Sequence, residues 1–169
     1  MIIWITGMSA SGKTAIANEL YPLIKSKYKH TILLDGDVFR DLHNNDVDHS
    51  MEGRKKNGER ICQMCHFLDK QGIHVICASL APFHELREWN RANYSKYFEV
   101  FLDVPLNVLV QRDPKGLYKM AMNGEMKNMV GIDLPFPTPR KPDVIVNNIG
   151  DRTPKEIAEE IFSKLNLDN

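Results

Sequence analysis

The stretch Ile2-Ile3-Trp4-Ile5-Thr6-Gly7-Met8-Ser9-Ala10-Ser11-Gly12-Lys13-Thr14 decides the fold. Its first five residues are apolar or β-branched and predict a buried strand. The following eight match the pattern G-x-x-x-x-G-K-[ST], and residues 15–20 continue with helical spacing. A strand, a glycine-containing loop and a helix in this order predict a site for the phosphates of a nucleoside triphosphate.

The residue types of this loop suit phosphate binding. Glycine lets the backbone wrap closely around a phosphate chain, and the helix N-terminus adds the positive end of its dipole. Lys13 is expected to reach the β- and γ-phosphates, and the Thr14 hydroxyl is expected to ligate Mg²⁺. The full set expected to bind the nucleotide here is Gly7, Ser9, Ala10, Ser11, Gly12, Lys13 and Thr14.

Size and composition limit the possible classes of protein. With 169 residues, 43% of them hydrophobic, the chain is expected to form one domain over residues 1–169. Its formal net charge is zero, so no overall field favours nucleic acid or a membrane as a partner. The chain has no apolar run of membrane-span length, and Met1 leads directly into the first strand, so no signal peptide is expected.

The cysteines indicate a reducing compartment. Cys62, Cys65 and Cys77 are an odd count without the spacing of a disulfide framework, which predicts a cytoplasmic protein. Residues 62–65 also match C-x-x-C, but they fall in a helical pattern without a second pair of ligands nearby. We therefore favour core thiols over a metal or redox site.

Two carboxylates follow the second predicted strand, Thr31–Leu34. The ligand crevice of a parallel α/β sheet lies outside the carboxyl ends of its strands, which is where Asp35-Gly36-Asp37 would lie. Because neighbouring carboxylates repel each other, a cation or substrate is the favoured reason for them. The alternative is structural, with Asp37 as the N-cap of a helix over residues 38–42.

The rest of the chain alternates helices with strands. Further strands are expected at 73–78, 98–104 and 143–148, and helices at 15–29, 50–72, 84–94, 105–110 and from 153 onward. This order predicts an α/β fold of three layers, a mostly parallel five-stranded sheet with helices on both faces. Pro22 is expected to kink or shorten the first helix. The apolar stripe of the helix after Ser50 is expected to contain Ile61, Met64, Cys65 and Leu68.

A segment rich in glycine, lysine and methionine spans residues 112–133. Gly116, Gly124 and Gly131 are possible hinges, so we interpret the segment as a lid over the phosphates. Its methionines have the simpler alternative of filling space in a core.

These motifs, in this order, resemble the adenosine 5′-phosphosulfate (APS) kinase family over nearly the whole chain. The most specific matches are the loop 7–14, Leu34–Asp37, the D-x-P-L turn at 103–106, Arg112–Lys119 and Gly131–Asp133. The resemblance implies a P-loop kinase that transfers the γ-phosphoryl group of ATP, with Mg²⁺, to the ribose 3′-hydroxyl of APS. It also implies a homodimer as a possible assembly.

The resemblance implies a role for each matching residue. Lys13, Asp35 and Asp37 would be catalytic, with Asp37 accepting a hydrogen bond from the attacking hydroxyl and Asp35 lying near the metal with Thr14. Arg112 and Lys115 would join the loop in binding ATP. The implied acceptor site contains Asp37, Arg40, His49, Arg54, Asn57, Ser79, Leu80, Ala81, Lys119, Met129 and Ile132.

The chain departs from the family pattern around the acceptor. The family holds adenine between two phenylalanines, but His49 and Met129 occupy the matching positions, and Ala81 replaces a serine. The usual N-terminal extension does not precede Met1 in this sequence. Some APS-kinase-like enzymes phosphorylate cytidine diphosphoramidate for capsule decoration, so the acceptor is either APS or a cytidine nucleotide.

A nucleotide-dependent switch protein is a third interpretation. It would share the phosphate-binding loop but should carry a guanine-reading N-K-x-D motif, which this sequence lacks. The D-x-x-G motif at residues 69–72 follows a predicted helix instead of a strand, so we interpret Gly72 as a left-handed helix cap.

Overall fold

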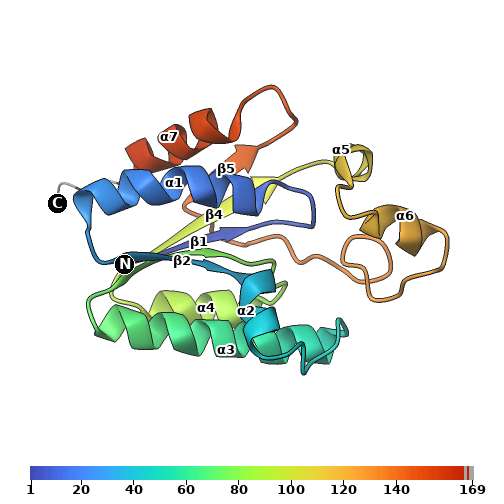
Figure 1. Cartoon of the computed structure of the whole chain (residues 1–169), viewed down its shortest axis with the longest axis horizontal. Helices are drawn as coiled ribbons and strands as arrows, with labels where there is room; N and C mark the ends of the chain where they lie inside the picture. The colour runs from blue at the N-terminus through green and yellow to red at the C-terminus, as the bar shows by residue number, and fades with distance from the viewer. Residues whose placement is uncertain (166, 168–169) are drawn as a thin grey trace.

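The computed structural model describes residues 1–165 and 167. Five parallel strands form one sheet in the order β2-β3-β1-β4-β5. The strands are β1 (Ile2–Thr6), β2 (Thr31–Asp35), β3 (His74–Ala78), β4 (Tyr97–Asp103) and β5 (Val144–Asn147). Figure 1 shows α1 (Lys13–Lys27) and α7 (Pro154–Lys164) on one face, with α3 (Met51–Lys70) and α4 (His84–Asn93) on the other. The predicted three-layer α/β fold is confirmed.

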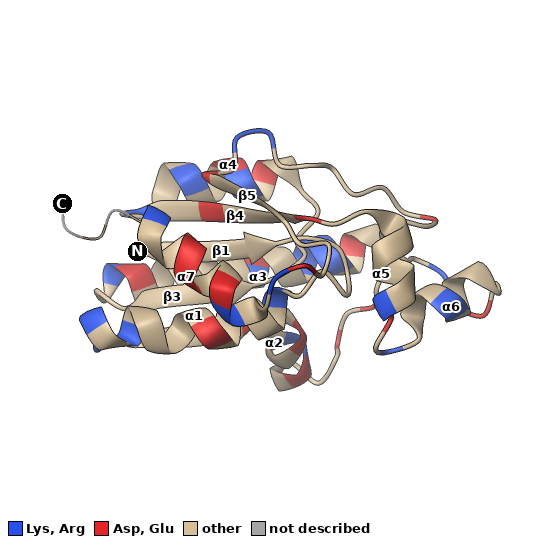
Figure 2. Ribbon diagram, turned by 90° about the horizontal axis from the view of Figure 1, so that it is seen from above, with Lys and Arg blue, Asp and Glu red and all other residues tan. Residues whose placement is uncertain are grey.

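The central strand β1 is buried on both faces, which explains its continuous apolar sequence. Ile3 and Ile5 belong to the core beneath α1 and α7, whereas Ile2 and Trp4 belong to the core beneath α3 and α4. This alternation follows from the two-residue period of a strand. Figure 2 shows where the charged residues lie. Lys, Arg, Asp and Glu occur on the helices, the loops and β4, whereas β1 and β3 carry none.

Several local sequence signals act as expected. The Ser50 hydroxyl accepts a hydrogen bond from the Gly53 N–H at the start of α3. At α7, Thr153 and Glu156 form a capping box, with proline in the first turn. Gly72 has φ 73° just after α3, as the cap interpretation of residues 69–72 requires.

Three local expectations or alternatives differ from the structure, in whole or in part. Helix α1 continues past Pro22 to Lys27, so the proline does not end it, and a kink at Pro22 stays a prediction. The N-cap of α2 (Gly36–Leu42) is Asp35, whose side chain accepts from the Asp37 N–H, so Asp37 does not cap this helix. Met64 is 40% exposed and lies outside the buried stripe of α3, where Cys62 lies instead.

The three cysteines are free, buried thiols in the core beneath α3 and α4. Burial raises the pKa of Cys62 to about 12, which makes its thiolate inaccessible near neutral pH. The core-thiol interpretation is therefore confirmed. Across the described residues, no helix combines the length and apolar character needed to cross a membrane.

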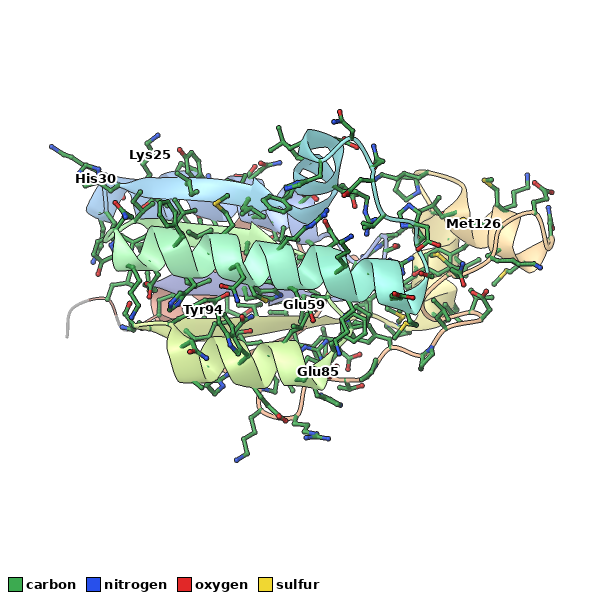
Figure 3. All side chains as sticks on the ribbon, turned by 90° about the horizontal axis from the view of Figure 1, so that it is seen from below. Lys25, His30, Glu59, Glu85, Tyr94 and Met126 are labelled. Atoms are coloured by element: carbon green, nitrogen blue, oxygen red, sulfur yellow. The ribbon has the colours of Figure 1, made fainter. Side chains whose placement is uncertain are left out.

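The predicted lid segment projects beyond the carboxyl ends of the strands. It contains the end of α5 (Leu106–Arg112) and all of α6 (Leu117–Met122), which extend to one side of the sheet in Figure 1. Val104, Leu109, Tyr118 and Met129 form a small separate core there. Figure 3 shows Met126 of this segment at the end of the molecule opposite Lys25 and His30.

Candidate active site

One cavity of about 920 Å³ gathers most of the predicted site residues. Its walls come from the loop after β1, α2, α3, the segment after β3 and the segment after α5. The predicted residues that line it are Ser9, Ala10, Gly12, Lys13, Thr14, Asp35, Asp37, Arg40, His49, Arg54, Asn57, Ser79, Leu80, Ala81, Arg112, Lys115 and Met129. Residues up to 120 positions apart in the sequence, from Ser9 to Met129, thus share one cavity.

Four predicted residues lie elsewhere. Gly7 and Ser11 are buried and do not line the cavity wall. Lys119 and Ile132 are exposed and lie outside the wall. These two therefore make no part of the cavity as it stands.

The loop before α1 needs glycine at two positions for different reasons. A Cβ on Gly7 would lie 2.9 Å from the carbonyl oxygen of Leu102 on the neighbouring strand β4. Gly12 has φ 97°, a left-handed conformation that residues with a side chain rarely adopt. The loop therefore lies close to β4 at the carboxyl end of the sheet and turns directly into α1.

Lys13 folds back over the loop that precedes it. Its Nζ donates hydrogen bonds to the carbonyl oxygens of Gly7 at 3.0 Å and Met8 at 2.8 Å. Burial lowers the pKa of Lys13 from 10.5 to about 8, although the charges of Asp37 and Asp35 oppose this shift. The ammonium group therefore lies beside the loop in surroundings that favour an anionic ligand.

Asp35 connects the loop with α2. The Thr14 hydroxyl donates to Asp35 Oδ2 at 2.6 Å, and Asp35 Oδ1 accepts from the Asp37 N–H at 2.9 Å. A hydroxyl and a carboxylate oxygen are the hard donors that Mg²⁺ prefers, and Mg²⁺ commonly takes one or two protein ligands beside substrate phosphates. Within the described residues, no group of three or more His, Cys, Asp and Glu side chains could hold a metal ion alone. Thr14 and Asp35 therefore fit Mg²⁺ that arrives with a nucleotide.

Asp37 forms an ion pair with Lys115, whose Nζ lies 2.7 Å from Asp37 Oδ2. Burial raises the pKa of the Asp37 carboxyl, but the hydrogen bond and charge of Lys115 outweigh burial, so the pKa lies below 3.8. The same contact raises the pKa of Lys115. Asp37 is thus a carboxylate at neutral pH and is able to accept a hydrogen bond from a hydroxyl group.

Two guanidinium groups lie at the α2–α3 side of the cavity. Arg40 is 8% exposed and donates to the carbonyl oxygens of Val47 and Asp48. Arg54 donates to the carbonyl oxygens of His49 and Asn128. Burial, together with the charge of Arg40, lowers the pKa of Arg54. Two neighbouring cations are costly without an anion between them, so this wall suits a phosphate-like group.

The side chains of His49 and Asn57 complete this wall. Partial desolvation at the cavity wall lowers the pKa of His49, and the charges of Arg40 and Arg54 lower it further, so the imidazole is mainly neutral at pH 7. Asn57 is buried, and its Oδ1 has no hydrogen-bond partner among the residues that the structure describes. A buried carbonyl oxygen of this kind normally accepts a hydrogen bond, which an acceptor hydroxyl or amine would supply.

The structure adds residues that sequence reasoning missed. Asp41 and Asn45 line the cavity, and Asn45 Nδ2 donates to Asp41 Oδ1 at 3.0 Å. Asp41 lies four positions after Asp37, on the same helix face, and this spacing was the available signal. Tyr118 and Asn148 donate hydrogen bonds to the carbonyl oxygens of Ser9 and Ser11 in the phosphate-binding loop, and no local pattern predicts those contacts.

The sheet order, the loop before α1 and the cavity beyond the strand ends define a P-loop phosphotransferase. The chain belongs to the adenylylsulphate kinase family, whose model matches residues 1–147. The protein is therefore an ATP-dependent kinase.

Named relatives include more than one kind of kinase. A cytidine diphosphoramidate kinase from Campylobacter jejuni is 37% identical over 166 residues, covering 98% of this chain and 96% of the relative. An adenylyl-sulfate kinase from Pseudomonas aeruginosa is also 37% identical over 166 residues, covering 97% of this chain and 84% of the relative. The APS kinase CysC of Mycobacterium tuberculosis, solved with AMPPNP and APS, superposes with a TM-score of 0.88 at 34% identity, covering 97% of this chain and 96% of the other.

Proposed function

We propose that this kinase transfers the γ-phosphoryl group of ATP to the ribose 3′-hydroxyl of a small nucleotide with an anionic 5′ substituent. The observation that carries the proposal is the position of Asp37. This carboxylate lines the same cavity as the phosphate-binding loop and the paired guanidinium groups of Arg40 and Arg54. A nucleotide held by its 5′ anion on these arginines would present its ribose to Asp37.

Phosphoryl transfer depends on positioning and charge neutralisation more than on covalent chemistry. Lys13 would neutralise the β- and γ-phosphates, and Arg112 and Lys115 would hold the ATP from the lid segment 112–133. Thr14 and Asp35 would hold Mg²⁺, which would neutralise charge on the transferring phosphoryl group. Asp37 would orient the attacking 3′-hydroxyl and take its proton.

For the acceptor base, we propose cytosine over adenine, with a cytidine nucleotide such as cytidine diphosphoramidate used at least as well as APS. Met129 is 2% exposed and packs in the core of the lid segment, and His49 is exposed at the other wall. Neither offers the large flat face that would clamp a purine. The similarity to the Campylobacter jejuni cytidine diphosphoramidate kinase, over nearly the full length of both chains, supports this proposal.

APS is the second candidate acceptor. Its support is the equal identity to adenylyl-sulfate kinases and the superposition on an APS kinase solved with APS. An imidazole ring also stacks on a base, and a thioether packs on one. If APS is the acceptor, His49 and Met129 would replace the two phenylalanine rings of the family without a change of substrate.

Steady-state assays of the purified protein with ATP, Mg²⁺ and a panel of acceptors test the proposal. The panel contains APS, cytidine 5′-diphosphate and cytidine diphosphoramidate, and ADP release is scored for each against an acceptor-free control. ³¹P NMR of the product locates the new phosphate on the ribose. ADP release that no acceptor stimulates would contradict the proposal and favour a nucleotide-binding switch.

We also propose that the protein is cytoplasmic, as its cysteines suggest, and that it forms a homodimer, as the resemblance to its family implies. The three free thiols are compatible with a reducing compartment. Light scattering of the purified chain measures the mass of the assembly, and a mass of 19.4 kDa would show a monomer instead.

A further inference from the structure

Tyr118 links the lid segment to the phosphate-binding loop. It lies in α6, is 0% exposed, and donates its hydroxyl hydrogen to the carbonyl oxygen of Ser9 at 3.0 Å. The turn before α6 fixes this position, since Asp113 accepts from the backbone N–H groups of Tyr118 and Lys119. Tyr118 is therefore fixed at two points, by its backbone N–H on Asp113 and by its hydroxyl on the loop.

Asn148 makes an equivalent contact with a second carbonyl oxygen of the loop. It follows β5, is 8% exposed, and donates from Nδ2 to the carbonyl oxygen of Ser11 at 2.9 Å. Its own backbone carbonyl accepts from Arg112 Nη2 at 2.9 Å. A Cβ on Gly12 would lie 2.8 Å from Asn148 Nδ2, so the glycine is what permits this close approach.

These two contacts fix the direction of two peptide groups. In a trans peptide the C=O and N–H bonds point in opposite directions, and the described chain contains no cis peptide. With the Ser9 carbonyl held by Tyr118, the Ala10 N–H points away from α6. With the Ser11 carbonyl held by Asn148, the Gly12 N–H points away from β5.

Both N–H groups belong to residues that line the cavity. In the part of the chain that the structure describes, neither has a hydrogen-bond acceptor. Backbone N–H groups normally find a partner, so a ligand with acceptor oxygens is the expected one here. Ala10 also has φ 60°, a conformation that residues other than glycine rarely adopt without support from their surroundings.

We propose that Tyr118 and Asn148 are positioning residues that hold the Ser9–Ala10 and Ser11–Gly12 peptides in the phosphate-binding orientation before ATP arrives. This inference rests on the proposed role of the loop in binding ATP. Tyr118 lies on the lid segment and acts through the Ala10 N–H, while Asn148 acts through the Gly12 N–H. Neither side chain lines the cavity.

The first test compares Tyr118→Phe with Tyr94→Phe. Tyr94 is a matched control, since its buried hydroxyl also donates to a backbone carbonyl, that of Cys62 at 3.1 Å. It lies well away from Met126 and the lid in Figure 3. Loss of the Tyr118 hydroxyl should weaken ATP and ADP binding about three- to tenfold and leave adenosine binding unchanged, since one ordinary hydrogen bond is lost. Tyr94→Phe should leave the binding of all three ligands unchanged.

The second test compares Asn148→Asp with Asn147→Asp. Both variants add one negative charge at the end of β5, but Asn147 is exposed and does not line the cavity, whereas Asn148 donates to the Ser11 carbonyl oxygen. Asn148→Asp replaces the donor with an oxygen facing the Ser11 carbonyl, so ATP should bind more weakly than to Asn147→Asp.

Amide NMR with a non-hydrolysable ATP analogue supplies a readout that a general loss of stability would not produce. In the wild type, the analogue should shift both the Ala10 and the Gly12 N–H resonances. The Ala10 shift should shrink in Tyr118→Phe with Gly12 unaffected, and the reverse should hold in Asn148→Asp. The inference would be overturned if both variants bound ATP as tightly as the wild type and kept the wild-type shifts of the Ala10 and Gly12 resonances. Equal loss of ATP affinity in Tyr118→Phe and Tyr94→Phe would also overturn it. Failure of the wild type to bind ATP would instead contradict the proposed function.

Discussion

Lys115 Nζ lies 2.7 Å from Asp37 Oδ2, so the lid segment is ion-paired to the carboxylate proposed to receive the acceptor's proton. The two residues are 78 positions apart in the sequence. Both side chains are largely exposed, so the pair contributes little to stability. Its importance is chemical, because it lowers the pKa of Asp37 and links the segment 112–133 to α2.

Replacing Lys115 should therefore change the acid limb of the pH profile. The Lys115 contact lowers the pKa of Asp37 against the opposing effect of burial. In Lys115→Ala this pKa should rise, so activity should be lost at a higher pH as the solution is acidified. The measurement is kcat/KM for the acceptor against pH, because this quantity reports the pKa values of the free enzyme. Lys127→Ala, which removes another exposed lysine of the same segment, should retain the wild-type limb. An unshifted limb in Lys115→Ala would show that Asp37 does not govern it.

Lys13→Ala should nearly abolish transfer without unfolding the protein. Removal of one preorganised group that stabilises the transition state typically lowers kcat by about 10²–10³. Turnover and thermal unfolding are measured together, with Lys25→Ala as the control. Lys25 lies on the same helix, at the far end of the molecule in Figure 3. Near-normal turnover in Lys13→Ala would show that the loop after β1 does not perform the proposed chemistry.

The affinity for ATP should decline above pH 8. Burial lowers the pKa of Lys13 to about 8, so the ammonium form dominates below this pH and is lost above it. Phosphate binding requires the charged form, so affinity should fall by up to about tenfold per pH unit once Lys13 is neutral. Isothermal titration with a non-hydrolysable ATP analogue in buffers of differing ionisation enthalpy measures both the affinity and the proton uptake. A constant affinity from pH 7 to 10, without proton uptake, would contradict the prediction.

Asp35 and Asp37 should give different defects. Asp37→Asn keeps the shape but cannot take a proton, so kcat should fall while ATP affinity changes little. Asp35→Asn removes a charge beside Thr14, so the Mg²⁺ concentration needed for half-maximal rate should rise. Rates measured against Mg²⁺ concentration at fixed ATP separate the two. If Asp37→Asn shows the Mg²⁺ defect and Asp35→Asn does not, the two roles are reversed.

The sequence predicts the fold because its signals are local. An apolar strand, a glycine-containing loop and the start of a helix lie within fourteen residues. Strands and helices then alternate along the rest of the chain. The same holds for Asp35 and Asp37, which lie at a strand end that any parallel sheet turns toward its ligand crevice. The alternative in which Asp37 caps α2 is wrong, because capping depends on a single contact in which Asp35 Oδ1 accepts from the Asp37 N–H.

What the sequence does not reveal are contacts between distant segments. Tyr118 reaches Ser9 across 109 positions, and Asn148 reaches Ser11 across 137. Neither pair carries a spacing that a pattern could detect. The burial of Met129 is of the same kind, since its place in the core of the lid depends on Leu109 and Tyr118 packing around it.

The most direct measurement is kcat/KM of the wild-type protein for cytidine diphosphoramidate and for APS under the same conditions. Stacking on a base is worth roughly 1–3 kcal/mol, so an acceptor wall with His49 and Met129 in place of two rings should lose about tenfold or more for a purine. We predict that the cytidine acceptor has a kcat/KM equal to or above that of APS, and that His49→Phe shifts the ratio toward APS. A wild-type kcat/KM for APS far above that of every cytidine nucleotide would contradict the account.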